Sequence, residues 1–375
     1  MKNEIKKFNK AYESDASQLK GKTEEVIFPE NIEEVKKTVL NLKRIVPRGG
    51  GTGLAGGAVP QGNGDFILDL SKLNKIENLD KERMTIEVEA GVILDELQDY
   101  LEEYNLEFPI NPSSHSICTI GGMIATDAVG SRAIKYKKTS QWTKWLDIID
   151  CYGNLSRKGI TELSDYIGME GITGIIVRAS LKLSPKKIRT ATVIGSDSIE
   201  DISEKTRILK KNPTISMIEF VDKKISKGIG LNEKYHLIIE FESNTGELKN
   251  EEYSKILETR DKIYPFLSNQ GYNRIEDPKV SLESFEGLFP WLEKQDIPVF
   301  GHLSVGIIHP CFNTQQEKLI PRMMEIVKRK GGKISGEHGI GILKKSFVEP
   351  NDKKILANIK KRTDPLNKFN VNKVI

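Results

Sequence analysis

Residues 47–57 constrain this chain more than any other stretch, because six of the nine residues from Gly49 onward are glycine. Residues 45–46 are apolar and residues 66–70 have the pattern of a strand, so we predict a turn between two strands rather than the start of a long helix. Glycine permits positive φ angles, and successive backbone N–H groups that point into one concavity bind phosphate. We expect such an anion site here, with Arg48 adding positive charge at its edge.

Glycine density alone leaves a second interpretation open. The stretch lacks the Gly-Lys-Ser/Thr of a P-loop, and it does not open the helix of a dinucleotide-binding βαβ unit. A mobile surface loop without a ligand has the same composition, and short glycine motifs often match by chance.

Charge and length exclude several classes of protein. The chain has 375 residues, enough for two domains. Its 57 basic and 53 acidic residues are mixed along the chain, which argues against a nucleic-acid partner. No apolar run approaches the roughly 20 residues of a membrane helix, and residues 1–7 are too polar for a signal peptide. We expect a cytoplasmic protein, with peripheral contact at the inner face of a membrane left open, and the sequence carries no signal of oligomeric state.

The three cysteines support the same setting. Cys118, Cys151 and Cys311 are few and far apart, which predicts a reducing compartment and no disulfide framework. Their spacing also fits no iron–sulfur cluster.

Two further glycine-rich turns follow in the first half of the chain. Gly121 and Gly122 stand where a helix could start, and we expect their N–H groups to offer a second anion site. Residues 168–177 place three glycines before an apolar strand. Three such turns in one region favour a ligand site over three unrelated turns. The elements predicted around them are helices at residues 32–42 and 94–104 and strands at residues 85–90 and 146–150.

The second half alternates strands and helices after a boundary near Pro185. That order predicts an antiparallel sheet covered on one face by helices. The predicted strands are residues 191–195, 216–221, 235–241 and 298–304, and the predicted helices are residues 198–210, 248–267, 281–292 and 315–330.

Three of the five histidines, His302, His309 and His338, lie within 37 positions of one another, beside Glu337. Imidazole and carboxylate suit a divalent transition metal, and two histidines with one glutamate leave a coordination position open. His302 and His309 would face opposite sides of one regular strand, so we expect Gly306 to supply a turn or bulge between them. Chance clustering is the alternative.

Several motifs together resemble a known family. Residues 48–57, Thr119-Ile-Gly-Gly with Ala125-Thr126, and residues 171–176 resemble the FAD domain of the vanillyl-alcohol oxidase superfamily. Residues 301–309 and 335–341 narrow this to the FAD-linked D-2-hydroxyacid dehydrogenases, which include D-lactate dehydrogenase, D-2-hydroxyglutarate dehydrogenase and the flavoprotein subunit of glycolate oxidase. The similarity runs from about Tyr12 to the last residues.

This resemblance implies an α+β fold. A PCMH-type FAD-binding domain would occupy residues 1–187, and an α+β cap domain with an antiparallel sheet would occupy residues 188–345 and carry the metal motif. Residues 346–375 would return to the FAD domain. The chain is short for the family, so we expect a trimmed cap.

The resemblance also implies the site. FAD would be bound non-covalently, since the glycine turn holds no histidine, and His115 is expected to serve its loop rather than form a covalent bond. The divalent metal, Zn or Mn, would be held by His302, His309 and Glu337. The residues implied to bind FAD are Pro47, Arg48, Gly49, Gly50, Gly51, Thr52, Gly53, Leu54, Pro112, Ser113, Thr119, Gly121, Gly122, Ala125, Thr126, Gly174, Ile176 and Asn370.

The expected reaction oxidises a 2-hydroxy acid such as D-lactate or glycolate, with hydride passing to flavin N5. His338 is the candidate base, because imidazole titrates near neutral pH. Arg260 matches the family arginine that grips the substrate carboxylate, although a solvated helix arginine is the alternative for any single arginine. No nicotinamide site is visible, so electrons would leave through a partner such as a cytochrome or a quinone.

The chain departs from the family pattern around the substrate. The usual motif is His-x-Gly-Asp-Gly-Asn-x-His, and a threonine and a lysine of the usual pocket are also replaced. We therefore expect a less polar pocket. Two alternatives follow: a non-catalytic flavin-binding subunit of a larger oxidase, and a flavoprotein with other chemistry, such as an alkyl-ether lipid synthase or an aldonolactone oxidase. The replacing residues are Ser304, Val305, Ile307, Tyr264 and Ile275, with Arg274 adjacent.

Overall fold

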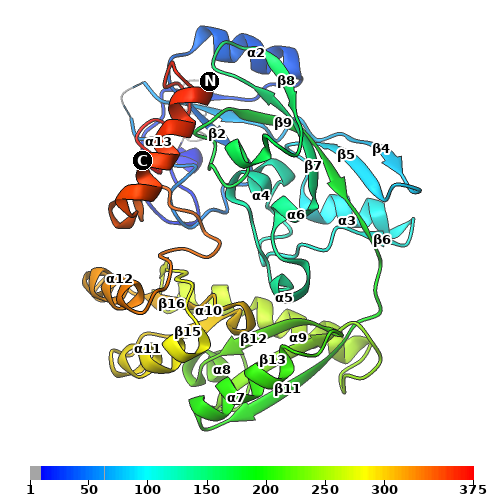
Figure 1. Ribbon diagram of the computed structural model, residues 1–375, viewed down its shortest axis with the longest axis vertical. Helices are drawn as coiled ribbons and strands as arrows, with labels where there is room; N and C mark the ends of the chain where they lie inside the picture. The colour runs from blue at the N-terminus through cyan, green and yellow to red at the C-terminus, as the bar shows by residue number, and fades with distance from the viewer. Residues whose placement is uncertain (1–9, 63) are drawn as a thin grey trace.

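The protein is described by a computed structural model that covers residues 10–62 and 64–375. The stretch judged too polar for a signal peptide lies outside these residues. The chain forms two bodies stacked along the long axis (Figure 1). It crosses from the upper to the lower body once and returns through the segment that follows α12 (Ile320–Arg329).

The upper body holds two main sheets. The first is parallel, in the order β1-β3-β2, and the second is antiparallel, in the order β4-β5-β9-β7-β8. A short pair, β6 with β10, lies where the chain leaves this body. The strands are β1 (Val26–Ile27), β2 (Ile45–Arg48), β3 (Phe66–Asp69), β4 (Ile76–Asp80), β5 (Thr85–Glu89), β6 (Leu106–Glu107), β7 (Thr143–Ile149), β8 (Leu155–Lys158), β9 (Ile175–Lys182) and β10 (Ser184–Pro185).

Helices complete this body, and two of them correspond to the helices that the apolar spacing predicted at residues 32–42 and 94–104. Asn31 caps the first one, because its side chain accepts a hydrogen bond from the Glu34 amide at 3.0 Å. Val35 and Val39, on its apolar face, are fully buried. The helices are α2 (Ile32–Asn41), α3 (Leu94–Glu102), α4 (Ile120–Thr126), α5 (Ala133–Tyr136) and α6 (Thr139–Trp142), with a 3₁₀ turn, η1 (Leu163–Asp165).

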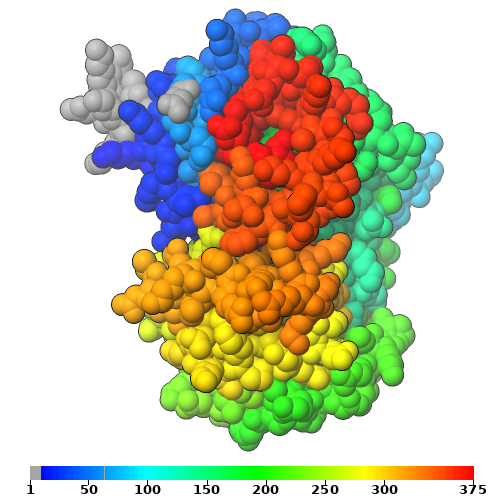
Figure 2. All heavy atoms as spheres, turned by 60° about the vertical axis from the view of Figure 1, so that its left-hand side comes forward, coloured from blue at the N-terminus to red at the C-terminus, as the bar shows by residue number. Residues whose placement is uncertain are grey.

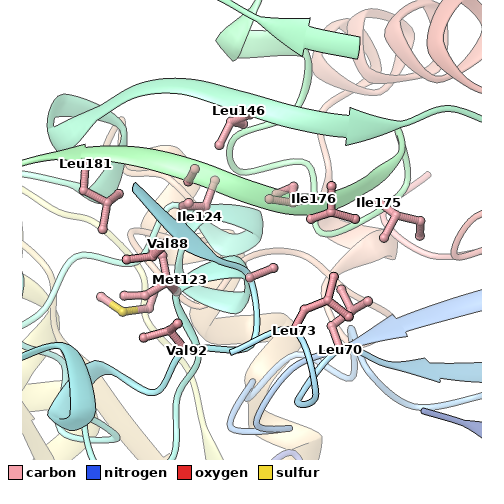
Figure 3. Packing of buried hydrophobic residues seen from close by; sticks show 14 of the residues in the cluster. Leu70, Leu73, Val88, Val92, Met123, Ile124, Leu146, Ile175, Ile176 and Leu181 are labelled. Carbon is pink, nitrogen blue, oxygen red and sulfur yellow. The ribbon is translucent and has the colours of Figure 1, made fainter. Parts of the chain in front are cut away.

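The core of the upper body lies between the antiparallel sheet and α4 (Figure 3). Val88, Leu146 and Ile175 from three strands and Ile124 from α4 are all fully buried. This packing fixes α4 and the turns around it against a rigid sheet, which is how binding turns are usually positioned.

The lower body is one antiparallel sheet in the order β11-β13-β12-β15-β16-β14. Its strands are β11 (Thr190–Ser196), β12 (Ile215–Val221), β13 (Tyr235–Phe241), β14 (Arg274–Ile275), β15 (Val299–Gly301) and β16 (His309–Phe312). Its helices are α7 (Ile199–Leu209), α8 (Lys223–Gly228), α9 (Glu251–Asp261), α10 (Ile263–Asn269), α11 (Leu282–Lys294) and α12, with 3₁₀ turns η2 (Leu303–Val305) and η3 (Glu317–Leu319).

Helices cover both faces of this sheet, so the predicted one-sided cover is wrong. Phe220 and Leu237 pack on the side of α7, α11 and α12, whereas Val221 and Ile238 pack on the side of α8, α9 and α10. Every residue of β12 is buried. A strand buried on both faces is a continuous apolar run rather than an alternating one, and residues 215–221 follow that pattern except at Ser216 and Glu219.

Three further elements have other bounds than the sequence predicted. The helix expected at residues 248–267 begins at Glu251, after Asn250 with a φ of 51°, and it is divided at Lys262 into α9 and α10. The helix expected at residues 315–330 begins at Ile320, with a proline in its first turn. The strand expected at residues 298–304 stops at Gly301, because a turn follows it.

Buried charges join the two bodies. Arg132, at the start of α5, makes a two-pronged contact with Glu240 of β13, at 2.8 and 3.1 Å. Arg189, in the crossing segment, contacts Glu107 of the upper body at 2.6 Å and Glu242 of the lower body at 3.2 Å. Paired in this way, the charges fix the orientation of one body on the other.

The last part of the chain returns to the upper body, where it lies over the surface in red (Figure 2). It comprises η4 (Lys345–Phe347) and α13 (Pro350–Thr363), followed by an irregular end. Asn370 belongs to no strand. Its backbone amide donates to the Ile45 carbonyl at 2.9 Å, and its side chain donates to the Glu170 carbonyl at 2.7 Å. These contacts support the division at residues 187 and 345, which stays a prediction. No helix in the described ranges is long and apolar enough to cross a membrane.

Replacing Arg132 by Met is expected to lower the free energy of unfolding by about 3–5 kcal/mol at pH 7, because it leaves the buried Glu240 carboxylate without its main partner. Lys36→Met is the control: Lys36 pairs with Glu33 at the surface, at 2.7 Å, and losing this pair costs at most about 0.5 kcal/mol. Urea unfolding followed by tryptophan fluorescence measures both.

The difference in the free energy of unfolding between wild type and Arg132→Met should depend on pH. Burial raises the pKa of Glu240, but Arg132 and Arg189 outweigh burial and bring it down to about 2. A depressed carboxyl pKa gives stability that is present above the unfolded-state value and is lost as the pH falls through the folded value. The gap between wild type and Arg132→Met should therefore narrow from about pH 4 to about pH 2, and a gap that widens there would contradict it.

Candidate active site

A cavity of about 610 Å³ lies between the two bodies. Its volume is that of small-molecule and cofactor sites. The glycine turn, the start of α4 and the irregular residues 112–119 line its upper wall, and α9, α10, β15 and β16 line its lower wall. All of the residues that the sequence implicated in binding FAD border this cavity, as do Arg260, His302, His309, Glu337 and His338.

The glycine turn needs its glycines for two different reasons. A side chain at Gly49 would meet the Thr119 hydroxyl at 2.2 Å, and one at Gly50 would meet the Ile117 carbonyl at 2.2 Å. These two glycines therefore let the turn approach residues 117–119. Gly51 has a φ of 67°, which disfavours other residues.

Gly53 has neither reason. Its φ is not positive, and a Cβ there would meet no atom within 4 Å. Gly53 nevertheless borders the cavity. The backbone N–H groups of residues 49–53 donate to no described residue. An open run of amides beside space that a single methyl would enter fits a bound phosphate group, and FAD carries two.

Arg48 borders the cavity beside this turn, and its guanidinium also binds backbone carbonyls. Its Nη1 donates to the carbonyls of Ser14 at 3.0 Å, Ala58 at 3.4 Å and Tyr12 at 3.5 Å. Burial lowers the pKa of this guanidinium below its ordinary value. Arg48 therefore ties the first described segment to the glycine turn.

The second anion site expected at the start of α4 is not formed. The Gly121 amide donates to the Ala90 carbonyl at 2.8 Å, and the Gly122 amide donates to the Thr119 hydroxyl at 3.2 Å. The Ile120 amide donates to the Val92 carbonyl at 2.9 Å. The turn at residues 90–92 and the Thr119 side chain thus occupy the amides that an anion would need. Gly121 is glycine because a Cβ would lie 2.6 Å from that of Ala90.

Three candidate metal ligands converge on the lower wall. His302 follows β15, His309 begins β16, and Glu337 lies in the loop after α12. One ligand atom from each lies within 4.8 Å of the other two. The Nε2 atoms of His302 and His309 are 3.8 and 3.2 Å from the Glu337 carboxylate. Gly306, with a φ of 78°, makes the turn between the two histidines, as expected.

The donor set fits a metal. Both histidines are almost completely buried. The Glu337 oxygen that lies 3.8 Å from His302 Nε2 has no hydrogen-bond partner among the described residues, and buried polar atoms are rarely left in that state. The neighbouring imidazoles hold the pKa of Glu337 well below its usual value against the opposing effect of burial, so a carboxylate is available as a ligand.

Glu219 was missed by the sequence analysis. It is fully buried in β12, and one of its oxygens lies 3.2 Å from His302 Nδ1 and 3.2 Å from Arg260 Nη2. Burial raises its pKa, but His302 and Arg260 lower it to about 2. A carboxylate that contacts the far nitrogen of a histidine ligand fixes the ring orientation. One acidic residue inside the apolar run 215–221 was the signal that could have identified it.

Two more buried carboxylates, both missed, hold the loop that carries Glu337 and His338. An oxygen of Asp277 accepts the amides of Gly336, Glu337 and His338, at 2.9, 2.6 and 2.7 Å. From the upper body, Glu170 accepts the amides of Ile340 and Gly341, at 2.6 and 2.8 Å. Lys344 pairs with Asp277 on its other oxygen. Glu170 lies in the glycine-rich turn of residues 168–177 and Asp277 lies outside the motifs, and neither position indicates a contact with residues 336–341, which are far away in the sequence.

His338 lies beside the three candidate ligands. Its ring stacks on that of His309, with centroids 4.9 Å apart and planes at 13°. Its Nε2 is 3.3 Å from the Glu337 carboxylate, and its Nδ1 is 3.8 Å from the Asp277 carboxylate. Arg260 borders the same cavity, but Glu219 and Asp261 already bind its guanidinium.

The departures from the family motif separate into two groups. Val305 and Ile307 do not border the cavity and instead pack against Val129 and Ala133 of the upper body. Our expectation that they make the pocket less polar is therefore not met at these two positions. Tyr264 and Ile275 do border the cavity. His115 contacts Asp95 at 2.7 Å, in keeping with a role in its loop.

Known families match both parts of the chain. A model described as an FAD binding domain matches residues 23–158, and a model of the C-terminal domain of FAD linked oxidases matches residues 279–374. The glycolate oxidase subunit GlcD of Bacillus subtilis is 27% identical over 97% of this chain and 91% of its own. A D-lactate dehydrogenase of Archaeoglobus fulgidus is 29% identical over 93% of this chain and 91% of its own. The chain therefore contains an FAD binding domain and a C-terminal domain of FAD linked oxidases, and it is similar over nearly its whole length to FAD-linked D-2-hydroxyacid dehydrogenases.

Further comparisons agree with this family and with the fold. A D-2-hydroxyglutarate dehydrogenase of Xanthomonas citri is 24% identical over 86% of this chain and 82% of its own. Two solved structures of alkyldihydroxyacetonephosphate synthase give TM-scores of 0.67 and 0.68 at 17% and 18% identity, each over 94% of this chain and 77% of theirs. The α+β fold with a PCMH-type FAD-binding domain and an antiparallel cap sheet is confirmed. The matched domains and relatives show an FAD-linked oxidoreductase.

Gly53→Ala tests the place of the cofactor. The added methyl group enters the cavity without touching the chain, so the stability of the apoprotein should change by less than about 1 kcal/mol, while FAD affinity falls at least about tenfold, or about 1.4 kcal/mol. Gly159→Ala also adds a methyl group in open space, but outside the cavity, and should change neither quantity. Thermal unfolding of the apoprotein and FAD titration by fluorescence measure both, and unchanged affinity in Gly53→Ala would place FAD elsewhere.

Proposed function

We propose that this protein oxidises a D-2-hydroxy acid to the 2-oxo acid with non-covalently bound FAD and a divalent metal, Zn or Mn. The main support is that two imidazoles, one carboxylate and the His338 ring converge on a cavity whose opposite wall is the glycine turn. FAD, when bound, supplies the hydride acceptor, and a metal at His302, His309 and Glu337 supplies the charge that acidifies the substrate hydroxyl.

His338 takes the proton of that hydroxyl at Nε2, the nitrogen on the side of Glu337. Asp277, 3.8 Å from Nδ1, stabilises the imidazolium that results. The same carboxylate fixes the loop through three amides, so it sets the position of the base as well as its charge. A base whose second nitrogen faces a buried carboxylate keeps one ring orientation.

Arg260 binds the substrate carboxylate with the side of its guanidinium that now contacts Asp261. That contact, at 3.0 Å, involves an Asp261 side chain that is 40% exposed, and an incoming carboxylate can replace it. The contact with fully buried Glu219 remains. Glu219 thereby contacts both Arg260, which orients the substrate, and His302, whose ring it orients. An acceptor such as a cytochrome or a quinone reoxidises the flavin.

Anaerobic mixing with D- and L-2-hydroxy acids tests the reaction. One D-acid should bleach the flavin absorbance, a chelator should abolish the bleaching, and Zn²⁺ or Mn²⁺ should restore it. A flavin that no 2-hydroxy acid reduces would refute the reaction and support a non-catalytic flavin-binding subunit. Bleaching that survives complete metal removal would instead refute the metal.

Two variants separate the roles of neighbouring residues. Glu337→Gln should keep FAD and lose the metal, as determined by elemental analysis of the purified protein. His338→Asn should keep both, yet slow bleaching by roughly 10²–10⁴-fold, the usual contribution of a general base. Loss of metal in His338→Asn, or unchanged bleaching, would show that His338 is not the base.

A further inference from the structure

We propose that the substrate carries a single carboxylate and an apolar side chain larger than a methyl group, and that Ile275 is the residue that excludes a second carboxylate. This inference rests on the proposed function and specifies the substrate class of that site. It is carried by the residues that form the lower wall of the cavity and by the charges that border it.

The lower wall beside the candidate metal ligands is apolar. Phe300 packs against His309, with ring centroids 4.7 Å apart, and Ile275 in β14 is 3% exposed. Tyr264 is half-buried in α10, and burial raises the pKa of its phenol above its ordinary value. Ile263 and Pro265 complete this wall. A substrate whose hydroxyl lies at His302, His309 and Glu337 therefore places its side chain against this apolar wall.

The charges around the cavity leave no cation for a second carboxylate. The described lining residues include two cations besides the histidines, Arg48 and Arg260, and no lysine. Arg48 donates to three backbone carbonyls, and Arg260 is shared by Glu219 and Asp261. Three carboxylates, Glu170, Asp261 and Glu337, border the cavity as well. A further buried anion needs a partner that these residues do not offer.

The cationic side chain next to Ile275 in the sequence, that of Arg274, faces away from the cavity. Arg274 precedes Ile275 in β14, and successive side chains of a strand point to opposite faces. Arg274 Nε contacts the fully buried Glu276 at 2.6 Å, and Arg274 does not border the cavity. The strand therefore presents Ile275 to the substrate. The register with β16, in which Ile275 is opposite Cys311, fixes this orientation.

The holoenzyme can be tested with a series of D-acids and dichlorophenolindophenol as electron acceptor. D-2-hydroxy-4-methylpentanoate should exceed D-lactate in kcat/KM by at least about tenfold, since each buried methylene contributes about fourfold. D-Malate and D-2-hydroxyglutarate should fall about 10- to 100-fold below D-lactate, because a buried carboxylate is left unpaired. If the kcat/KM for D-malate or D-2-hydroxyglutarate equals that for D-lactate, this inference is overturned and the proposed function stands. Reduction by none of the acids overturns the proposed function and the inference with it.

Ile275→Lys tests the assigned residue. Added positive charge at this place should raise the ratio of kcat/KM for D-malate to that for D-2-hydroxy-4-methylpentanoate at least about tenfold. Ile188→Lys adds the same charge at a side chain that is 70% exposed, outside the cavity, and should leave the ratio unchanged. If Ile275→Lys fails to retain flavin, Tyr264→Lys places the cation on the neighbouring, less buried wall. An unchanged ratio in the folded variant overturns the role of Ile275.

Discussion

Five backbone amides of one loop bind two buried carboxylates, and the candidate site depends on this arrangement. Asp277 of the lower body accepts the amides of residues 336–338, and Glu170 of the upper body accepts those of residues 340 and 341. Glu337 and His338 lie in this loop, so their positions are set by both bodies at once. Burial raises the pKa of Glu170 to about 7 even against these two donors, whereas Lys344 holds that of Asp277 at about 2. The loop is thus held by two carboxylates in unlike surroundings: the environment of Asp277 favours its charged form, whereas burial opposes the charged form of Glu170.

Buried charge also connects the candidate metal ligands to the substrate-binding wall. Glu219, Arg260 and His302 form a chain of contacts with almost no exposure to water. Such groups are costly to bury, and removing one member leaves the others unpaired. Burial lowers the pKa of His302, but Glu219 outweighs burial and raises it, so this carboxylate favours a proton or a metal cation on the imidazole. A metal competes with that proton, and Glu219 compensates the charge in either case.

The sequence predicted local features well and long-range ones poorly. The glycine turn, the capped helix after Asn31 and the grouping of His302, His309 and Glu337 follow from short motifs. The structure brings the glycine turn and the three grouped residues to one cavity. The amides of Gly121 and Gly122 were misjudged because their acceptors include the distant Ala90 carbonyl. Glu170, Glu219 and Asp277 were missed because a single carboxylate gains its role only from tertiary neighbours. Val305 and Ile307 seemed to belong to the pocket from their motif, yet packing directs them to the junction with Val129 and Ala133.

The return of the chain to the upper body has a consequence for biosynthesis. Asn370 borders the cavity and contacts residues 45, 57 and 170, so the upper body is assembled from segments more than 300 positions apart. On the ribosome, the first 187 residues emerge long before residue 370 does, and domains whose contacts are non-local form late. The cofactor cavity is therefore completed only after nearly the whole chain has been translated. The glycine turn, which emerges early, gains this last neighbouring wall only at that stage.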